Sequence, residues 1–168
     1  MTDPIEYCQQ NHNLIVDTFN LLKNNNNKWP ETNLYSGDWR SIPLRYDYKT
    51  VIPTLLDDFL KQTSIAMFSI LGPSTELKKH KGHLGYCEHI KRYHYCIHES
   101  EDNVLVVNYE PYVWQEGEGF WFDDSQDHWG WNRGLKDRVI LMFDIPNDPT
   151  NPPAMTATMN ERFNDRIF

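Results

Sequence analysis

The stretch that decides the fold runs from Gly119 to Asp144 and reads GFWFDDSQDHWGWNRGLKDRVILMFD. It begins with an aromatic, strand-like segment, passes through an acidic turn that contains His128, and ends in an apolar, β-branched strand that begins at Arg138. Binding sites of β-barrels are commonly built from polar residues at the ends of apolar strands. His128 and Arg138 are therefore the first candidate site residues, although a histidine in an acidic turn is also typical of a plain surface position.

Outward from this stretch, short apolar segments separated by turn residues fill the chain from Ser64 onwards. The apolar run 65–71 ends at Gly72-Pro73 and predicts a buried strand. Further strands are expected at Leu77–His80, Ile90–His98, Val104–Tyr109, Tyr112–Trp114, Phe120–Phe122 and Arg138–Ile145. Many short strands at this spacing are typical of a sandwich or a barrel, so the fold is expected to be mainly β.

The N-terminal third predicts helices that support this β region. Asp3-Pro4 is typical of a helix start, because the aspartate can cap free N–H groups and proline suits the first turn. A second helix is expected over Val51–Gln62, and a weak helical turn near Glu161–Ile167. One domain is expected over residues 1–168, divided into helical support (1–63), the β core (64–146) and an irregular tail (147–168).

Composition excludes several classes of function. The 168 residues suit one domain with a sizeable core. A net charge of −8, with no basic stripe, argues against a nucleic-acid partner, because such proteins need a basic surface. An aromatic content of 14% suits a β-rich fold with an aromatic-lined cavity.

The start of the chain, its apolar stretches and its cysteines together predict the cellular compartment. The start of the chain has neither a basic segment nor an apolar run, so no signal peptide is expected. No apolar stretch approaches the roughly 20 residues that span a bilayer. Cys8, Cys87 and Cys96 lack metal-type spacing and are expected to be reduced thiols. We therefore expect a soluble cytoplasmic protein, which could pair as a homodimer through exposed strand edges.

Histidines cluster in the strand-rich half, where six of the seven lie: His80, His83, His89, His94, His98 and His128. Imidazole suits first-row metals such as iron. His89 and His98 are interpreted as ordinary polar strand positions. The chain has no H-x-D/E tripeptide, so a metal here would have two protein ligands, with water and a chelating co-substrate in the other positions.

Five segments, in order, resemble one known family: LGPSTELKKHKG (71–82), KRYH (91–94), WQEGE (114–118), FDDSQDHWGWN (122–132) and DRVILMFD (137–144). They are similar to the aspartyl/asparaginyl β-hydroxylases, which are Fe(II)- and 2-oxoglutarate-dependent oxygenases. That family is built on a double-stranded β-helix, a jelly-roll barrel related to the cupins. The resemblance covers roughly residues 34–146, and its most specific string is F-D-D-S-x-x-H-x-x-W-N.

The resemblance implies a role for each matching residue. His128 would be the distal iron ligand. Arg138 would form a salt bridge to the far carboxylate of 2-oxoglutarate, and Ser69 would help to hold that carboxylate. Arg92 and His94 would contact the near carboxylate of the co-substrate. The family uses water in place of a carboxylate ligand, which agrees with the missing tripeptide.

The first iron ligand has two candidates. Alignment from the N-terminal side places L-K-K-H-K-G on the family's apolar-x-P-H-x-G and selects His80, with Lys79 in place of the usual proline. Counting back from Arg92 without a gap selects His83 instead. His80 is preferred, because three extra residues fit more easily in the loop after the ligand, and His83 stays as the alternative.

The resemblance further implies an activity. The chain would hydroxylate a C–H bond of an Asp/Asn-type side chain in a peptide or protein, consuming O₂ and 2-oxoglutarate and releasing succinate and CO₂. The alternatives are a catalytically silent, cupin-like binding module, and a hydroxylase of a lipid or a free amino acid. Asp123, Asp124 and Asp127 are expected either to orient His128 or to be solvated turn charges. The nearby tryptophans are expected in the core or in a cavity wall: Trp114, Trp121, Trp129 and Trp131.

Overall fold

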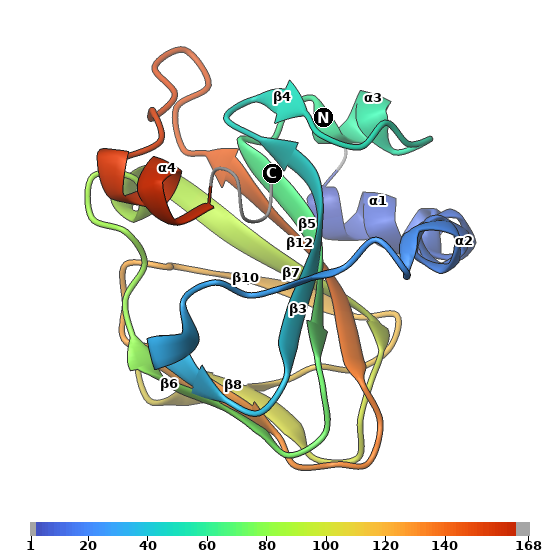
Figure 1. Ribbon diagram of the computed structural model, residues 1–168. Coiled ribbons are helices and arrows are strands. Elements are labelled where there is room, and N and C mark those ends of the chain that lie inside the picture. The colour runs from blue at the N-terminus through green and yellow to red at the C-terminus, as the bar shows by residue number, and fades with distance from the viewer. Residues whose placement is uncertain (1–2, 164–168) are drawn as a thin grey trace.

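The structure is a computed structural model that describes residues 3–163 (Figure 1). Its helices are α1 (Pro4–Gln10), α2 (His12–Leu22), α3 (Asp57–Leu60) and α4 (Ala157–Phe163), with 3-10 turns η1 (Thr32–Leu34) and η2 (Cys87–His89). Its strands are β1 (Asn27–Lys28), β2 (Tyr35–Ser36), β3 (Trp39–Tyr46), β4 (Lys49–Thr50), β5 (Ile65–Leu71), β6 (Thr75–His80), β7 (Ile90–His98), β8 (Asn103–Val107), β9 (Glu110–Val113), β10 (Gly119–Phe122), β11 (His128–Asn132) and β12 (Arg138–Pro146).

The strands form two antiparallel sheets that pack face to face. The larger sheet has the order β1-β3-β5-β12-β7-β10, with β4 paired to β3, and the smaller has the order β2-β6-β11-β8-β9. Apolar side chains from both sheets meet in one core, among them Met67 and Ile140 from the larger sheet and Leu105 from the smaller. The fold is therefore a mainly β, double-stranded β-helix of the jelly-roll type, as predicted.

The central strands of the larger sheet are buried on both faces. In β12, Val139, Leu141 and Phe143 belong to an outer core, whereas Ile140 and Met142 belong to the core between the sheets. Because both faces are covered, the strand reads as one continuous apolar run rather than an alternating one. Alternation of side chains also places polar residues at even positions of β12 on the inner face, between the two sheets.

Helices cover the outer face of the larger sheet (Figure 1). Asp3 caps α1 as predicted, since its carboxylate accepts hydrogen bonds from the backbone N–H groups of Ile5 and Glu6. α1 and α2 then bury Cys8, Ile15 and Phe19 against this face. Within residues 3–163, no helix is long and apolar enough to cross a membrane.

Three expectations differ from the structure. The helix predicted over Val51–Gln62 is wrong in extent: only α3 forms, because Thr54 and the Asp57 carboxylate close a turn instead, with Thr54 N–H donating to Oδ1 at 3.0 Å. The region 1–63 also contributes β3, a full strand beside β5. In the tail, α4 forms earlier than the turn expected near Glu161–Ile167, and residues 164–167 of that turn lie outside the described part of the chain.

Candidate active site

Two histidines face each other on the smaller sheet. His80 ends β6 and is the register partner of His128, the first residue of β11, and their ring centroids are 4.3 Å apart. The expectation that His128 sits in an acidic turn is therefore wrong. The strand was hidden because its buried positions are His128, Gly130 and Asn132, which do not form an apolar alternation.

Both imidazoles are held in the form that binds metals. Nδ1 of His80 lies 2.6 Å from the Lys78 carbonyl oxygen, and Nδ1 of His128 lies 2.9 Å from that of Gln126. A carbonyl only accepts, so each Nδ1 carries the hydrogen and each Nε2 keeps its lone pair. Burial lowers the pKa of His128, although Asp124 opposes the shift, so the ring is neutral at pH 7.

The alternative ligand, His83, does not lie opposite His128. It follows in the loop after β6, where its Nε2 is 3.5 Å from Oε1 of Glu31 and its ring packs edge-on to Phe163. Within residues 3–163, no group of three or more His, Cys, Asp or Glu side chains is arranged to hold a metal ion. The structure thus brings together two imidazoles without a carboxylate ligand, and His80 is the partner of His128.

Arg138 is a buried cation without a counter-ion. It is 2% exposed, stacks its guanidinium 4.3 Å from the Trp114 ring, and donates from Nη2 to the Ser69 hydroxyl at 2.9 Å. Its Nε has no hydrogen-bond partner, and none of the carboxylates in residues 3–163 pairs with it. Burial lowers its pKa to about 9, which still leaves it charged at pH 7. An unpaired buried charge is costly, so this position is suited to an anionic ligand.

Ser69 adds a second donor beside Arg138. Its hydroxyl oxygen accepts from Arg138 Nη2 and from the Trp39 indole N–H, at 2.9 and 3.0 Å. A hydroxyl has two acceptor lone pairs and one hydrogen. Because both lone pairs are used, the hydroxyl hydrogen is left to donate to a ligand.

A cavity of about 50 Å³ joins the histidine pair to Arg138. Its walls come from both sheets: Trp39, Ser69, Leu77, His80, Arg92, His94, Phe122, His128, Arg138 and Met142. It contains all the residues that the resemblance assigns to iron or to 2-oxoglutarate. The cavity therefore has two imidazoles on one wall and an unpaired guanidinium on another.

His94 is fixed as a neutral donor. It is buried on the inner face of β7, and its Nδ1 accepts the indole N–H of Trp114 at 3.2 Å. Burial, assisted by the charges of Arg138 and Arg92, holds the pKa of His94 well below its usual value. The hydrogen of this neutral ring is consequently on Nε2, where it can be donated.

Arg92 differs from Arg138 because its charge is paired inside the protein. It forms two hydrogen bonds of 2.8 Å to the carboxylate of Asp144, its register partner on β12, and one of 3.0 Å to Asp124. Tyr86 donates to the same Asp144 at 2.7 Å. Asp124 is buried and also lies 3.5 Å from Nε2 of His128, so it is not a solvated turn charge.

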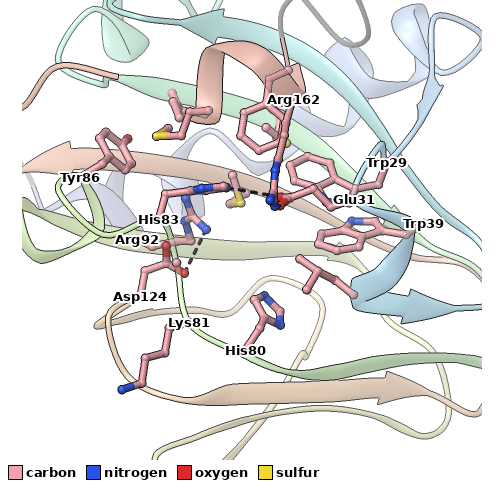
Figure 2. A pocket seen from close by; sticks show the side chains of 17 residues that line it. Trp29, Glu31, Trp39, His80, Lys81, His83, Tyr86, Arg92, Asp124 and Arg162 are labelled. Atoms are coloured by element: carbon pink, nitrogen blue, oxygen red, sulfur yellow. Dashed lines mark hydrogen bonds and ion pairs between the residues drawn. The ribbon is translucent and has the colours of Figure 1, made fainter. Parts of the chain in front are cut away.

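A larger chamber of about 190 Å³ adjoins this cavity and shares with it Trp39, His80, Arg92 and Met142 (Figure 2). At one side Glu31 accepts a 2.6 Å hydrogen bond from Arg162 of α4 and lies near His83. Sequence analysis did not single out Asp144, Glu31 or Arg162. Asp144 alone had a visible signal, since it lies six residues after Arg138 and hence on the same strand face.

Comparisons with known proteins agree with this geometry. A sequence model of the aspartyl/asparaginyl β-hydroxylase family matches residues 5–148. The chain belongs to that family. An oxidoreductase of the 2OG-Fe(II) oxygenase family from Burkholderia pseudomallei superposes with a TM-score of 0.60 at 8% identity, covering 80% of this chain and 79% of that one. This likeness shows the shared oxygenase fold.

A curated relative is 35% identical over 98 residues, which is 53% of this chain. It is an ornithine lipid ester-linked acyl 2-hydroxylase from Rhizobium tropici, and the match spans 31% of its length. Family and fold together support a hydroxylase of the oxygenase type.

Proposed function

We propose that this protein is an Fe(II)- and 2-oxoglutarate-dependent hydroxylase. The observation that carries the proposal is one cavity that joins two imidazoles, each held through Nδ1 by a backbone carbonyl, to a buried arginine without a counter-ion. An iron ion needs the first feature, and a dicarboxylate co-substrate fits the second. The family and the fold are consistent with this chemistry.

The residues present fit the metal. His80 and His128 would hold Fe(II) through Nε2, and the backbone carbonyls of Lys78 and Gln126 would keep both rings in the required tautomer. Two protein ligands leave positions for a chelating co-substrate and for O₂. When bound, iron and 2-oxoglutarate would supply the oxidising chemistry that hydroxylates a C–H bond and releases succinate and CO₂.

The rest of the cavity would bind and orient the co-substrate. Arg138 and the Ser69 hydroxyl hydrogen would donate to its far carboxylate, which would replace a costly unpaired charge by a charge-assisted pair. His94 would donate from Nε2 to the near carboxylate. Arg92 would act on that carboxylate with the N–H groups that Asp144 and Asp124 do not use, while holding Asp124 beside His128.

The prime substrate has two candidate classes. The family description favours an Asp/Asn-type side chain of a peptide or protein. The second candidate is an acyl chain, as in the name of the curated relative, and the apolar walls of the larger chamber favour it. We further infer that residues 1–168 act as one oxygenase domain, because β3 of the N-terminal third pairs with β5 beside the site.

Succinate formation from 2-oxoglutarate, followed by ¹H NMR with and without Fe(II), tests the proposal. We expect iron-dependent succinate in the wild type and in His83→Ala, and none in His80→Ala. The two variants are matched, because the same truncation is made three residues apart. Loss in His83→Ala alone would move the ligand to His83. No succinate in the wild type under any condition would favour the silent binding module.

A further inference from the structure

We propose that the larger chamber, between His80 and α4, binds the prime substrate as an uncharged hydrocarbon segment. The inference rests on the proposed function, since it names the substrate class of the same site. It departs from the expected Asp/Asn-type side chain wherever that side chain is charged. Three features of the chamber support it.

The chamber opens onto the iron ligands. It shares His80, Trp39, Arg92 and Met142 with the small cavity, so a ligand that fills it lies against an iron ligand (Figure 2). The two spaces thus share a wall that contains His80, and a C–H bond at the inner end of the chamber would be the one presented to the metal. This position is where a hydroxylase must hold its substrate.

The walls are mostly apolar: Trp29, Leu34, Trp39, Ile65, Met67, Tyr86, Met142, Met159 and Phe163. Methionine side chains are flexible and polarisable, so three of them adapt to a hydrocarbon chain better than to a polar group. At about 190 Å³ the chamber is smaller than usual drug-sized pockets of roughly 300 Å³ and more. It therefore accommodates one segment about the size of a side chain.

The charges inside the chamber are already paired within the protein. Glu31 is bound by Arg162 at 2.6 Å and lies near His83, and Arg92 is bound by Asp144 and Asp124. The remaining cation that lines the chamber, Lys81, is exposed to solvent. A charged ligand would either break one of these pairs or stay buried without a partner, and both are costly. An uncharged ligand avoids that cost.

Binding to the full-length, metal-free protein tests this directly by methionine methyl NMR. Met67, Met142 and Met159 line the chamber, and Met155 does not, so it serves as the internal control. The probes are hexanamide and adipamate, which present the same amide and chain length but differ by a terminal carboxylate. We expect hexanamide to shift the three chamber methyls and adipamate to bind at least about tenfold more weakly.

The chamber can also be filled by mutation. Leu34→Trp, on its partly exposed wall, should weaken hexanamide binding about tenfold, whereas Leu55→Trp, the same change at a residue 81% exposed elsewhere, should not. Stronger binding of N-acetyl-leucinamide than of hexanamide would identify a peptide side chain as the source of the segment, and the reverse order an acyl chain.

The outcomes separate this inference from the proposed function, because binding is measured without iron or 2-oxoglutarate. Equal or tighter binding of adipamate, or no shift of the chamber methyls with any probe, would overturn the inference even if succinate forms. Selective binding of hexanamide by a wild-type protein that never forms succinate would support the chamber and contradict the oxygenase.

Discussion

The small cavity and the larger chamber, which adjoin each other between the sheets, differ in whether their buried charges are paired. Arg138 in the small cavity is buried without a counter-ion, whereas Glu31 in the larger chamber and Arg92, which lines both spaces, form ion pairs within the protein. An unpaired buried charge is tolerated in a protein chiefly where a ligand completes it. This difference is the basis for the proposal that a dianionic co-substrate binds in the first space and an uncharged substrate in the second.

The largest expected effect is on the metal. His128→Ala would remove one of the two proposed protein ligands, so Mn(II), a redox-inert substitute for iron, should bind more than about 100-fold more weakly. Calorimetric titration measures this. His98→Ala is the matched control, because His98 lies at the far end of β7 and packs on Phe19. Equal Mn(II) affinity in both variants would mean that the histidine pair is not the metal site.

The second expected effect is a difference in stability between variants of the two arginines, Arg92 and Arg138. Arg92→Met leaves Asp144 and Asp124 buried without their partner, so the free energy of unfolding should fall by about 3–5 kcal/mol. Arg138→Met removes an unpaired charge from a buried position, so the ligand-free protein should be as stable as the wild type or more stable. Urea unfolding of both variants measures this. A larger loss in Arg138→Met would show that its charge is compensated in the protein.

The third expected effect compares how much Arg138 and Ser69 each contribute to the binding of the co-substrate. Arg138→Met should weaken 2-oxoglutarate binding to the Mn(II)-loaded protein by about 100-fold, because a charge-assisted contact is lost. Ser69→Ala should weaken it by about tenfold, because one neutral donor is lost. Mn(II) affinity should be unchanged in both. The order would be reversed if Ser69, rather than Arg138, were the main anchor of the carboxylate.

The smallest expected effect is the pH dependence of the stability that the ion pair between Glu31 and Arg162 of α4 contributes. Burial opposes ionisation of Glu31, but hydrogen bonds from His83 and Arg162 lower its pKa below the ordinary value of 4.5. A carboxyl whose pKa is lowered in the folded state stabilises the fold at a pH above its ordinary pKa. This stabilisation is lost as the pH falls through the pKa of the folded state. Glu31→Gln should therefore cost about 1 kcal/mol at pH 7, because Arg162 is partly exposed, and almost nothing near pH 3. Thermal melts across this range measure it, and a loss that does not depend on pH would contradict the ion pair.

Strands that are buried on both faces could be predicted from the sequence, whereas β11 could not. β5, β7 and β12 are rich in apolar and β-branched residues, and their predicted bounds nearly coincide with the structure. In β11 the buried positions are His128, Gly130 and Asn132, and the two tryptophans are only half-buried. Gly130 has no side chain because one would collide with the carbonyl of Val104 on β8. A strand whose inner face is polar or bare lacks the hydrophobic period on which prediction relies.

Some site residues could likewise be predicted from the sequence, and others could not. Resemblance pointed to the residues of the small cavity, and the register of β5, β7 and β12 brings the strand residues among them onto one inner face. Glu31 and Arg162 are 131 positions apart in the sequence and meet only because α4 returns to the loop before η1. No local pattern reports such a pair. The chamber is therefore a product of tertiary structure that the sequence alone does not reveal.

The most direct test of the central claim is anaerobic titration of the wild-type protein with Fe(II) and 2-oxoglutarate, followed by visible absorption. The account predicts a weak charge-transfer band at roughly 500 nm that requires both additions, because the metal site and the carboxylate site share one cavity. In Arg138→Met the band should need far more 2-oxoglutarate. No band and no thermal shift with either addition would contradict the account and leave the barrel without its proposed chemistry.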